Sequence, residues 1–193
     1  MQHRVLLGMS VIASLALRLV AAQDEPKEIT RDKSPDGKFA LEITKEEEGW
    51  SAAIIDAKSK GTVVSLEIYQ NYTEEAHLVW SRDSQRVAYF EPDRRGGSTT
   101  VYFRNGDKFD VVELPELPDC KIHRSNGEEH VKTIESTTKA EKWLNSGALV
   151  LKAHSDELME KGDNQYSKTC SQIVTVAFDA NRKGAVQSVK RVK

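Results

Sequence analysis

The stretch that most constrains the fold is Leu78 to Leu114, in which short apolar runs alternate with tight turns. Asn105-Gly106 is a strong hairpin signal, because both residues tolerate a positive φ. Pro115 and Pro118 cannot donate to a ladder and end the pairing. The runs between the turns are rich in residue types that favour strands: Gln85 to Phe90, Thr99 to Phe103 and Phe109 to Leu114. The stretch therefore predicts an antiparallel meander.

A turn motif opens this meander and occurs a second time earlier in the chain. The two copies are Trp80-Ser81-Arg82-Asp83-Ser84-Gln85-Arg86-Val87-Ala88 and Ser34-Pro35-Asp36-Gly37-Lys38-Phe39-Ala40. In both, the aspartate can cap its own backbone before a strand. The motif resembles the W-S-P-D-S/G-K-x-I-A signature of TolB-like and WD40-like β-propeller blades, although Arg82 stands where that signature prefers proline. We expect the Trp80 ring to be largely buried between the first hairpins and the meander.

The remaining segments indicate a mainly β chain of about nine strands with one or two short helices. Thr133 to Leu144 has helical composition and predicts a helix, while a competing interpretation makes Trp143 onward a degenerate third copy of the blade motif. His154 to Ser167 is predicted to be a polar connection, and Gln23 to Lys33 a flexible leader. The other predicted strands are Lys38 to Thr44, Trp50 to Asp56, Thr62 to Ile68, Ala148 to Ala153, Cys170 to Phe178 and Ala185 to Val192. The resemblance implies propeller-like antiparallel sheets, with a sandwich as the alternative; a closed propeller needs at least four blades, and the chain is too short for that.

Residues 1–22 have the pattern of a secretory signal peptide. His3 and Arg4 precede the apolar run Val5 to Val20, and Val20-Ala21-Ala22 fits a small-residue cleavage site. We therefore predict residues 1–22 to be a signal peptide and residues 23–193 to be a single β-rich domain, periplasmic or secreted, with no stable membrane span after cleavage. An uncleaved N-terminal anchor is the alternative.

Cys120 and Cys170 are the two cysteines of the chain. An exported protein meets an oxidising compartment, in which paired cysteines form disulfides. We predict a disulfide between Cys120 and Cys170, with two free buried thiols as the alternative.

The charge pattern and the motif inventory argue against several functions. The 28 basic and 30 acidic residues are well mixed, which argues against nucleic acid as a partner. No nucleophile elbow, zinc-protease helix or phosphate-binding loop is present in the sequence. His123 and His130 lie near acidic residues but match no spacing typical of a metal site. We predict no catalytic residues, no metal and no cofactor.

Four residues are the best candidates for binding. Arg94 and Arg95 lie at a hairpin tip, and Tyr69 and Tyr72 lie in a connection between strands. Arginine and tyrosine are enriched at binding hot spots, and loops on a rigid sheet commonly carry function. The blade resemblance implies action through protein contacts. We therefore predict an exported, non-catalytic module of the bacterial envelope that binds a protein or polymer. The alternatives are a small hydrolase with a carboxylate site and a small-ligand carrier.

Overall fold

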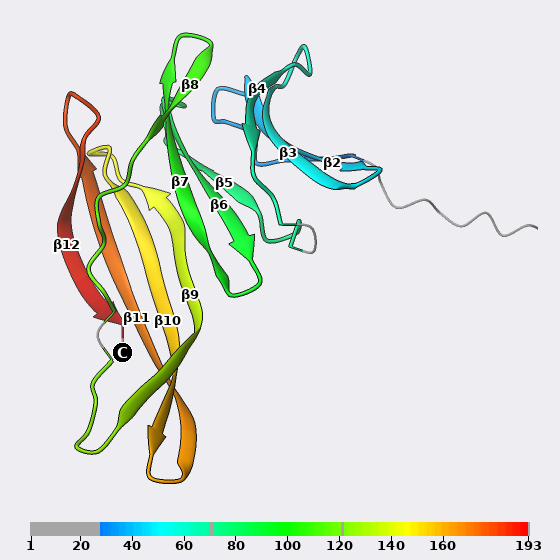
Figure 1. Ribbon diagram of the computed structural model, residues 1–193. Helices are drawn as coiled ribbons and strands as arrows, with labels where there is room; N and C mark the ends of the chain where they lie inside the picture. The colour runs from blue at the N-terminus through cyan, green and yellow to red at the C-terminus, as the bar shows by residue number, and fades with distance from the viewer. Residues whose placement is uncertain (1–27, 70–71, 121, 193) are drawn as a thin grey trace, which may run out of the picture.

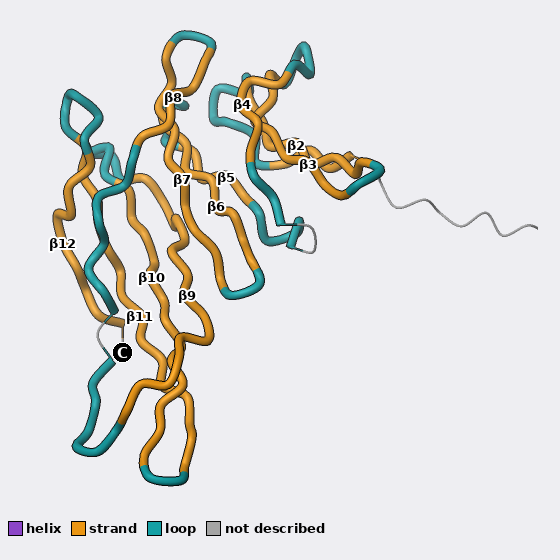
Figure 2. The backbone as a smooth tube through the Cα atoms, in the orientation of Figure 1, coloured by secondary structure: helices purple, strands orange, loops and turns teal. Residues whose placement is uncertain are grey.

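The computed structural model describes residues 28–69, 72–120 and 122–192, and the regular structure in these residues is entirely β-strand. Figure 2 accordingly shows strands and loops and no helix. The strands are β1 (Glu28–Arg31), β2 (Phe39–Glu46), β3 (Gly49–Asp56), β4 (Thr62–Leu66), β5 (His77–Trp80), β6 (Arg86–Asp93), β7 (Gly96–Asn105), β8 (Lys108–Val112), β9 (Glu129–Trp143), β10 (Leu149–Lys161), β11 (Asn164–Phe178) and β12 (Gly184–Val192). The predicted mainly β class is confirmed, and the predicted helices are absent from the described residues.

The strands form three successive antiparallel meanders of four strands each. We call β1–β4 the first meander, β5–β8 the second and β9–β12 the third, and within each of them every strand pairs with the next along the chain. The first is a separate sheet, and the other two share one sheet through β7 and β9. Figure 1 shows them following one another from the first meander at the right to the third at the left. Four-stranded sheets of this kind are the units of propeller blades, and three such units do not form a closed ring.

Related turns link the first two strands of each meander. The backbone N–H of Ser34 donates to the carbonyl of Phe39 at 2.8 Å, and that of Ser81 donates to the carbonyl of Arg86 at 2.9 Å. In each of these two turns the serine hydroxyl also donates to the aspartate two residues later, at 2.6 Å. In the third turn, between β9 and β10, the N–H of Leu144 donates to the carbonyl of Ala148 at 2.8 Å, so this turn is one residue shorter, and it lacks the serine at its first position. The turn after Trp143 therefore corresponds in position to the two copies of the motif, with neither their serine nor their aspartate.

The second meander is buried on both faces. Four consecutive residues of β6, from Val87 to Phe90, are at most 2% exposed. Because side chains of a strand alternate between faces, such a continuous apolar run is typical of a strand covered on both sides. Val87 and Tyr89 pack against the first meander, and Ala88 packs against the third. These two layers of core explain why this stretch carries the strongest strand signal in the sequence.

One tryptophan connects the second meander to the first, and another connects the third meander to the second. Trp80, at the end of β5, donates its indole Nε1–H to the carbonyl of Asp32 at 2.7 Å. Trp143, at the end of β9, donates in the same way to the carbonyl of Val79 at 2.9 Å. Asp32 and Val79 occupy the same position relative to the turns that begin at Ser34 and Ser81. The three meanders are therefore stacked by one repeated contact, and most of the Trp80 side chain is covered by the core between the first two meanders, as predicted.

Gly96 and Gly97 connect the second meander to the third. They pair in parallel with Ser136 and Thr137 of β9, and the N–H of Ser136 donates to the carbonyl of Arg95 at 2.8 Å. A Cβ at Gly96 would lie 2.2 Å from the carbonyl oxygen of Ser136. The two glycines are therefore required for close backbone approach, and this part of the hairpin is not a free tip.

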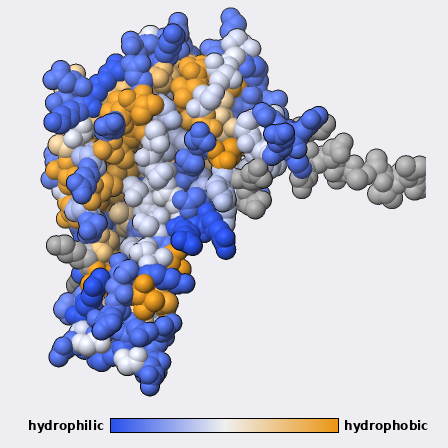
Figure 3. All heavy atoms as spheres, in the orientation of Figure 1, coloured by the Kyte–Doolittle hydropathy of each residue, from blue (hydrophilic) through white to orange (hydrophobic). Residues whose placement is uncertain are grey.

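Three segments differ from the sequence predictions. Thr133 to Leu144 lies mostly in β9 and not in a helix, because β10 pairs along its length and the Thr99 hydroxyl bonds to its other edge. Residues 154–167 are not a connection but the paired ends of β10 and β11, which turn at Gly162. These paired ends form a twisted arm below the rest of the chain, and mostly hydrophilic atoms cover it (Figures 1 and 3). Part of the predicted leader is strand β1.

The hairpin between β7 and β8 occurs where predicted but has a different turn. Asn105 pairs with Lys108, so the two turn residues are Gly106 and Asp107. Among these, only Gly106 has a positive φ, of 64°. Glycine at the first turn position is typical of a type II′ turn, whereas the Asn-Gly pair predicted type I′.

The predicted signal peptide lies outside the described residues. Within the described part of the chain, no helix is long and apolar enough to cross a membrane.

Candidate functional site

The site begins with the long connection between β8 and β9, residues 113–128, which crosses the inner face of the third meander. This face also packs against the second meander, through Val174 and Val176 of β11. Pro115 and Pro118 prevent the connection from pairing as a strand. Figure 1 shows it passing in front of β11 and β12 before it turns into β9. A segment without its own ladder needs other contacts to hold it in place.

Two covalent or polar contacts fix the middle of the connection. Cys120 forms a disulfide with Cys170 of β11, with a Cα–Cα distance of 5.8 Å, so the predicted pairing is confirmed in the structure. Next to it, the side-chain amide of Gln172 donates to the carbonyl of Pro118 at 2.5 Å. Cys170 and Gln172 are buried and point to the same face of β11. These two contacts hold the connection against β11.

Glu128 fixes the end of the connection. Its carboxylate accepts hydrogen bonds from Lys168 Nζ at 2.5 Å, from Tyr166 Oη at 2.6 Å and from the N–H of Ser125 at 2.6 Å. The Lys168 bond, followed by those of Tyr166 and Ser125, lowers the pKa of Glu128 from its ordinary value of 4.5 to about 2. The Glu128 bond in turn raises the pKa of the Tyr166 phenol. Three donors around one carboxylate favour its ionised form.

Acid is expected to weaken this contact, and the sign follows from the lowered pKa. A carboxyl group with a lower pKa in the folded state stabilises it above its unfolded pKa and loses that contribution as pH falls. The stability difference between the protein and Glu128→Gln should be full above pH 4.5 and should shrink as pH falls toward about 2. Urea unfolding across this range measures it. Glu116→Gln, an exposed carboxyl in the same connection, is the control, and a difference that stays constant with pH would contradict the assignment.

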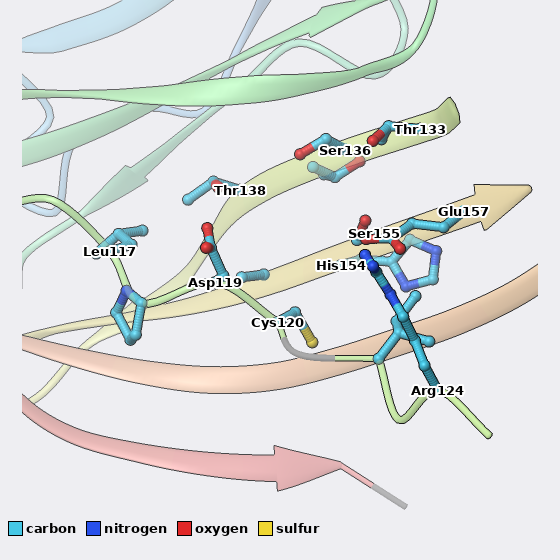
Figure 4. A pocket seen from close by; sticks show the side chains of 14 residues that line it. Leu117, Asp119, Cys120, Arg124, Thr133, Ser136, Thr138, His154, Ser155 and Glu157 are labelled. Atoms are coloured by element: carbon cyan, nitrogen blue, oxygen red, sulfur yellow. The ribbon is translucent and has the colours of Figure 1, made fainter. Parts of the chain in front are cut away.

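A groove of about 600 Å³ lies between the connection and strands β9 and β10 (Figure 4). Its floor is rich in hydroxyl groups from β9 and β10, and its other wall carries the charged side chains of Asp119 and Arg124. In Figure 4 the Asp119 carboxylate points from the connection toward the side of Thr138. The lining residues are Leu117, Pro118, Asp119, Cys120, Ile122, Arg124, Thr133, Ser136, Thr137, Thr138, Ala153, His154, Ser155 and Glu157.

The groove offers many hydrogen-bonding groups and little apolar surface. Hydroxyls donate and accept, Asp119 accepts and Arg124 donates, so the lining can satisfy a ligand with both kinds of group. Small-molecule sites are usually lined mainly by apolar and aromatic side chains, and this groove has no aromatic residue among those that line it. Its chemistry suits a polar ligand with repeated donors and acceptors.

Two histidines near the groove each contact one polar side chain of a neighbouring strand. Within the described residues, no group of three or more histidine, cysteine, aspartate or glutamate side chains is placed to hold a metal ion. His130 Nε2 lies 3.9 Å from Glu157 Oε2. His154 Nδ1 lies 2.8 Å from Ser171 Oγ, a cross-strand pair between β10 and β11. Among the residues that the structure describes, no acid forms a hydrogen bond with this histidine.

The predicted binding residues lie outside the groove. Tyr69 and Tyr72 come together with their ring centroids 6.0 Å apart, and Tyr69 is 51% exposed. Arg94 and Arg95 are exposed at the β6–β7 turn, and the backbone of Arg95 adjoins Ser136 at one edge of the groove. The structure therefore brings one predicted pair next to the groove and leaves the other apart from it.

Sequence reasoning did not identify the groove residues. The helix predicted over Thr133 to Leu144 would not place Ser136 and Thr138 on one floor with Ser155 of β10. The β-branched run Thr133-Ile134 and Thr137-Thr138 was the available signal, because such residues favour strands. The position of Asp119 opposite this floor depends on the disulfide and could not be read from spacing.

Comparisons with known proteins find little. No protein-family model matches the chain, and no curated protein matches it. Among solved structures, the crystal structure of TolB from Acinetobacter baumannii is similar with a TM-score of 0.35 and 10% sequence identity, covering 86% of this chain and 41% of TolB. The chain thus spans about two fifths of the TolB chain that it matches. This is a weak resemblance in fold.

Proposed function

We propose that the chain is an exported, non-catalytic interaction module of the bacterial envelope that binds an extended segment of a partner protein in the groove beside β9. The observation that carries the proposal is the groove itself: a polar, hydroxyl-lined floor formed by Ser136, Thr138 and Ser155, beneath a connection fixed by a disulfide. The disulfide also supports export, because such bonds persist in oxidising compartments.

The edge of β9 supports a polypeptide ligand. Within the described residues, β9 pairs with β7 only at Ser136 and Thr137, so residues 129–135 have β10 as their one strand partner. Such an edge presents free N–H and C=O groups, which an extended peptide can pair with while alternate side chains enter a neighbouring groove. Val131 and Ile134 on this edge are 43% and 39% exposed and offer apolar contacts.

The filled cores favour this reading over a small-ligand carrier. A carrier holds its ligand in a central apolar cavity, whereas the two apolar cores here are filled by side chains packed between the meanders. The groove is polar, and it lies on one face of the third meander.

The test is selection of peptides from a random library on the immobilised chain, followed by fluorescence anisotropy with the selected peptides. Ser155→Tyr fills the groove floor and is expected to weaken binding at least about tenfold, a loss typical of one blocked hot-spot contact. Thr169→Tyr is the matched control, because Thr169 is exposed on the opposite face of the same paired strands.

Two results would contradict the proposal. One is equal binding by Ser155→Tyr and the unmodified chain, with Arg94→Ala/Arg95→Ala or Tyr69→Ala/Tyr72→Ala abolishing it instead. That result would move the binding surface to the residues predicted from the sequence. The other is cleavage of the selected peptides, which would favour the hydrolase alternative.

A further inference from the structure

The stack of meanders ends in two faces that carry opposite charges. Tyr89 and Leu151 pack toward the preceding meander, and Ile43 packs toward the following one. Phe90 corresponds to Ile43 and lies on the same face of β6 as Ala88, which packs against the third meander. Counted from the residue whose carbonyl closes each turn (Phe39, Arg86 and Ala148), the position of Tyr89 and Leu151 is occupied by Glu42 in the first meander. Phe39, Leu41 and Ile43 pack into the core between the first two meanders, so strand alternation places Glu42 on the opposite, outer face of β2.

The outer face of the third meander carries a row of lysines. The position of Ile43 and Phe90 is occupied there by Lys152, which the register places in one row across the sheet with Lys139 and Lys190. Lys142 follows in the next row, beside Val150. Within the described residues, none of these four lysines forms an ion pair with an acid.

The row of lysines carries an energetic cost. Lys139 and Lys152 lie directly opposite each other on adjacent strands, and like charges in that arrangement destabilise a sheet. Lys139 additionally lies over the ring of Phe90, with its Nζ 5.0 Å from the centroid. An anionic partner on this face would attract these lysines and offset the repulsion between them.

The outer face of the first meander has the complementary charge. Glu28, Glu42 and Glu46 lie on this face, and Lys60 is the cation that contacts it, 3.1 Å from Glu28 and 3.5 Å from Glu42. The acids outnumber the lysine among the residues described there. Glu42 and Lys152 hold corresponding places at the two ends, so a repetition of the internal junction would bring them together.

We infer that a second copy of this chain docks head to tail, with the lysine face of the third meander of one copy against the glutamate face of the first meander of the other. Two such contacts close a ring of six meanders, within the four to eight blades of closed propellers. A head-to-tail interface that closes gives a finite ring rather than a filament. The inference is independent of the groove.

Charge reversal gives a specific test. The purified chain is studied by sedimentation equilibrium from ~1 µM to ~1 mM, the range that covers micromolar to millimolar dissociation constants. We expect a dimer that dissociates as salt rises, since exposed charges are screened. Lys152→Glu and Glu42→Lys should each raise the dissociation constant by about tenfold or more, because each places like charges at both junctions.

An equal mixture of the two variants should restore the dimer. Each junction of the mixed dimer then joins one positive and one negative side chain. In a dimer of either variant alone, each junction joins two side chains of the same charge. Lys108→Glu and Glu74→Lys, exposed charges away from both end faces, are the controls and should change nothing.

The outcomes of these experiments distinguish a second copy of the chain from an anionic membrane surface as the partner. A monomer throughout the concentration range, or a dimer unchanged by reversal and not re-formed by mixing, overturns the inference. Vesicles with anionic headgroups form a second arm of the experiment. Binding of a monomeric chain to such vesicles that Lys152→Glu abolishes would also overturn it and assign the lysine face to an anionic surface.

Discussion

Removing the Cys120–Cys170 disulfide is expected to lower the free energy of unfolding by about 4 kcal/mol. The bond joins residues 50 positions apart, so it restricts a long loop in the unfolded chain. In the folded state it holds the connection above β9 and β10. Denaturant unfolding with and without reductant measures the loss, and peptide affinity for the groove should fall with it.

The double variant Cys120→Ala/Cys170→Ala is the control for this experiment. It should unfold at the midpoint of the reduced protein, and reductant should not shift it further. Two reactive thiols per chain in the unfolded, unreduced protein would contradict the disulfide.

Replacing Trp80 with alanine is expected to cost about 3 kcal/mol, at the low end for a tryptophan because the side chain is partly exposed. The ring stacks on Phe39 of the first meander at 6.1 Å and meets Phe109 of β8 at 5.8 Å. Its indole also satisfies the carbonyl of Asp32. Trp80→Phe should retain most of the packing and lose about 1 kcal/mol for the hydrogen bond. Thermal and urea unfolding of both variants measure these losses.

Trp143 is the internal comparison, because it makes the same contact at the next junction. Trp143→Ala should give a similar loss, since its ring packs on Phe103 and Phe178 and its indole bonds to Val79. Trp50→Ala, which removes a half-buried ring without an inter-meander hydrogen bond in the described residues, should cost less. A melting temperature unchanged in Trp80→Ala would point to a ring that binds a ligand.

The strands that sequence reasoning missed share one position in the fold. Each of β1, β5 and β9 is the first strand of its meander. β1 and β5 have 4 residues each, which is too few for a period of two to be recognised. β9 is long but exposed along most of its length, so it lacks the apolar alternation of a half-buried strand. Its lysines, glutamates and alanine favour a helix locally, and pairing with β10 overrides that preference.

The candidate site was less accessible to sequence reasoning than the strands. The disulfide followed from two cysteines and a predicted signal peptide, because that argument needs only composition and compartment. Three segments that are distant in the sequence form the groove: the connection with Asp119, β9 with Ser136 and β10 with Ser155. Polar residues in loops and on exposed strands carry no periodic signal that places them opposite one another. The prediction of Arg94 and Arg95 found a turn beside the groove but not the groove itself.

The sequence by itself determined the β class, the turn motif, the disulfide and nine of the strands, because each depends on neighbours a few residues apart or on the pairing of two cysteines. Tertiary structure alone decided that the turns at Ser34, Ser81 and Leu144 start three equivalent meanders, stacked by Trp80 and Trp143. It also decided which faces are covered and which end in lysine or glutamate. A strand's pattern shows how its side chains alternate, but what covers each face is fixed only when distant segments pack against one another.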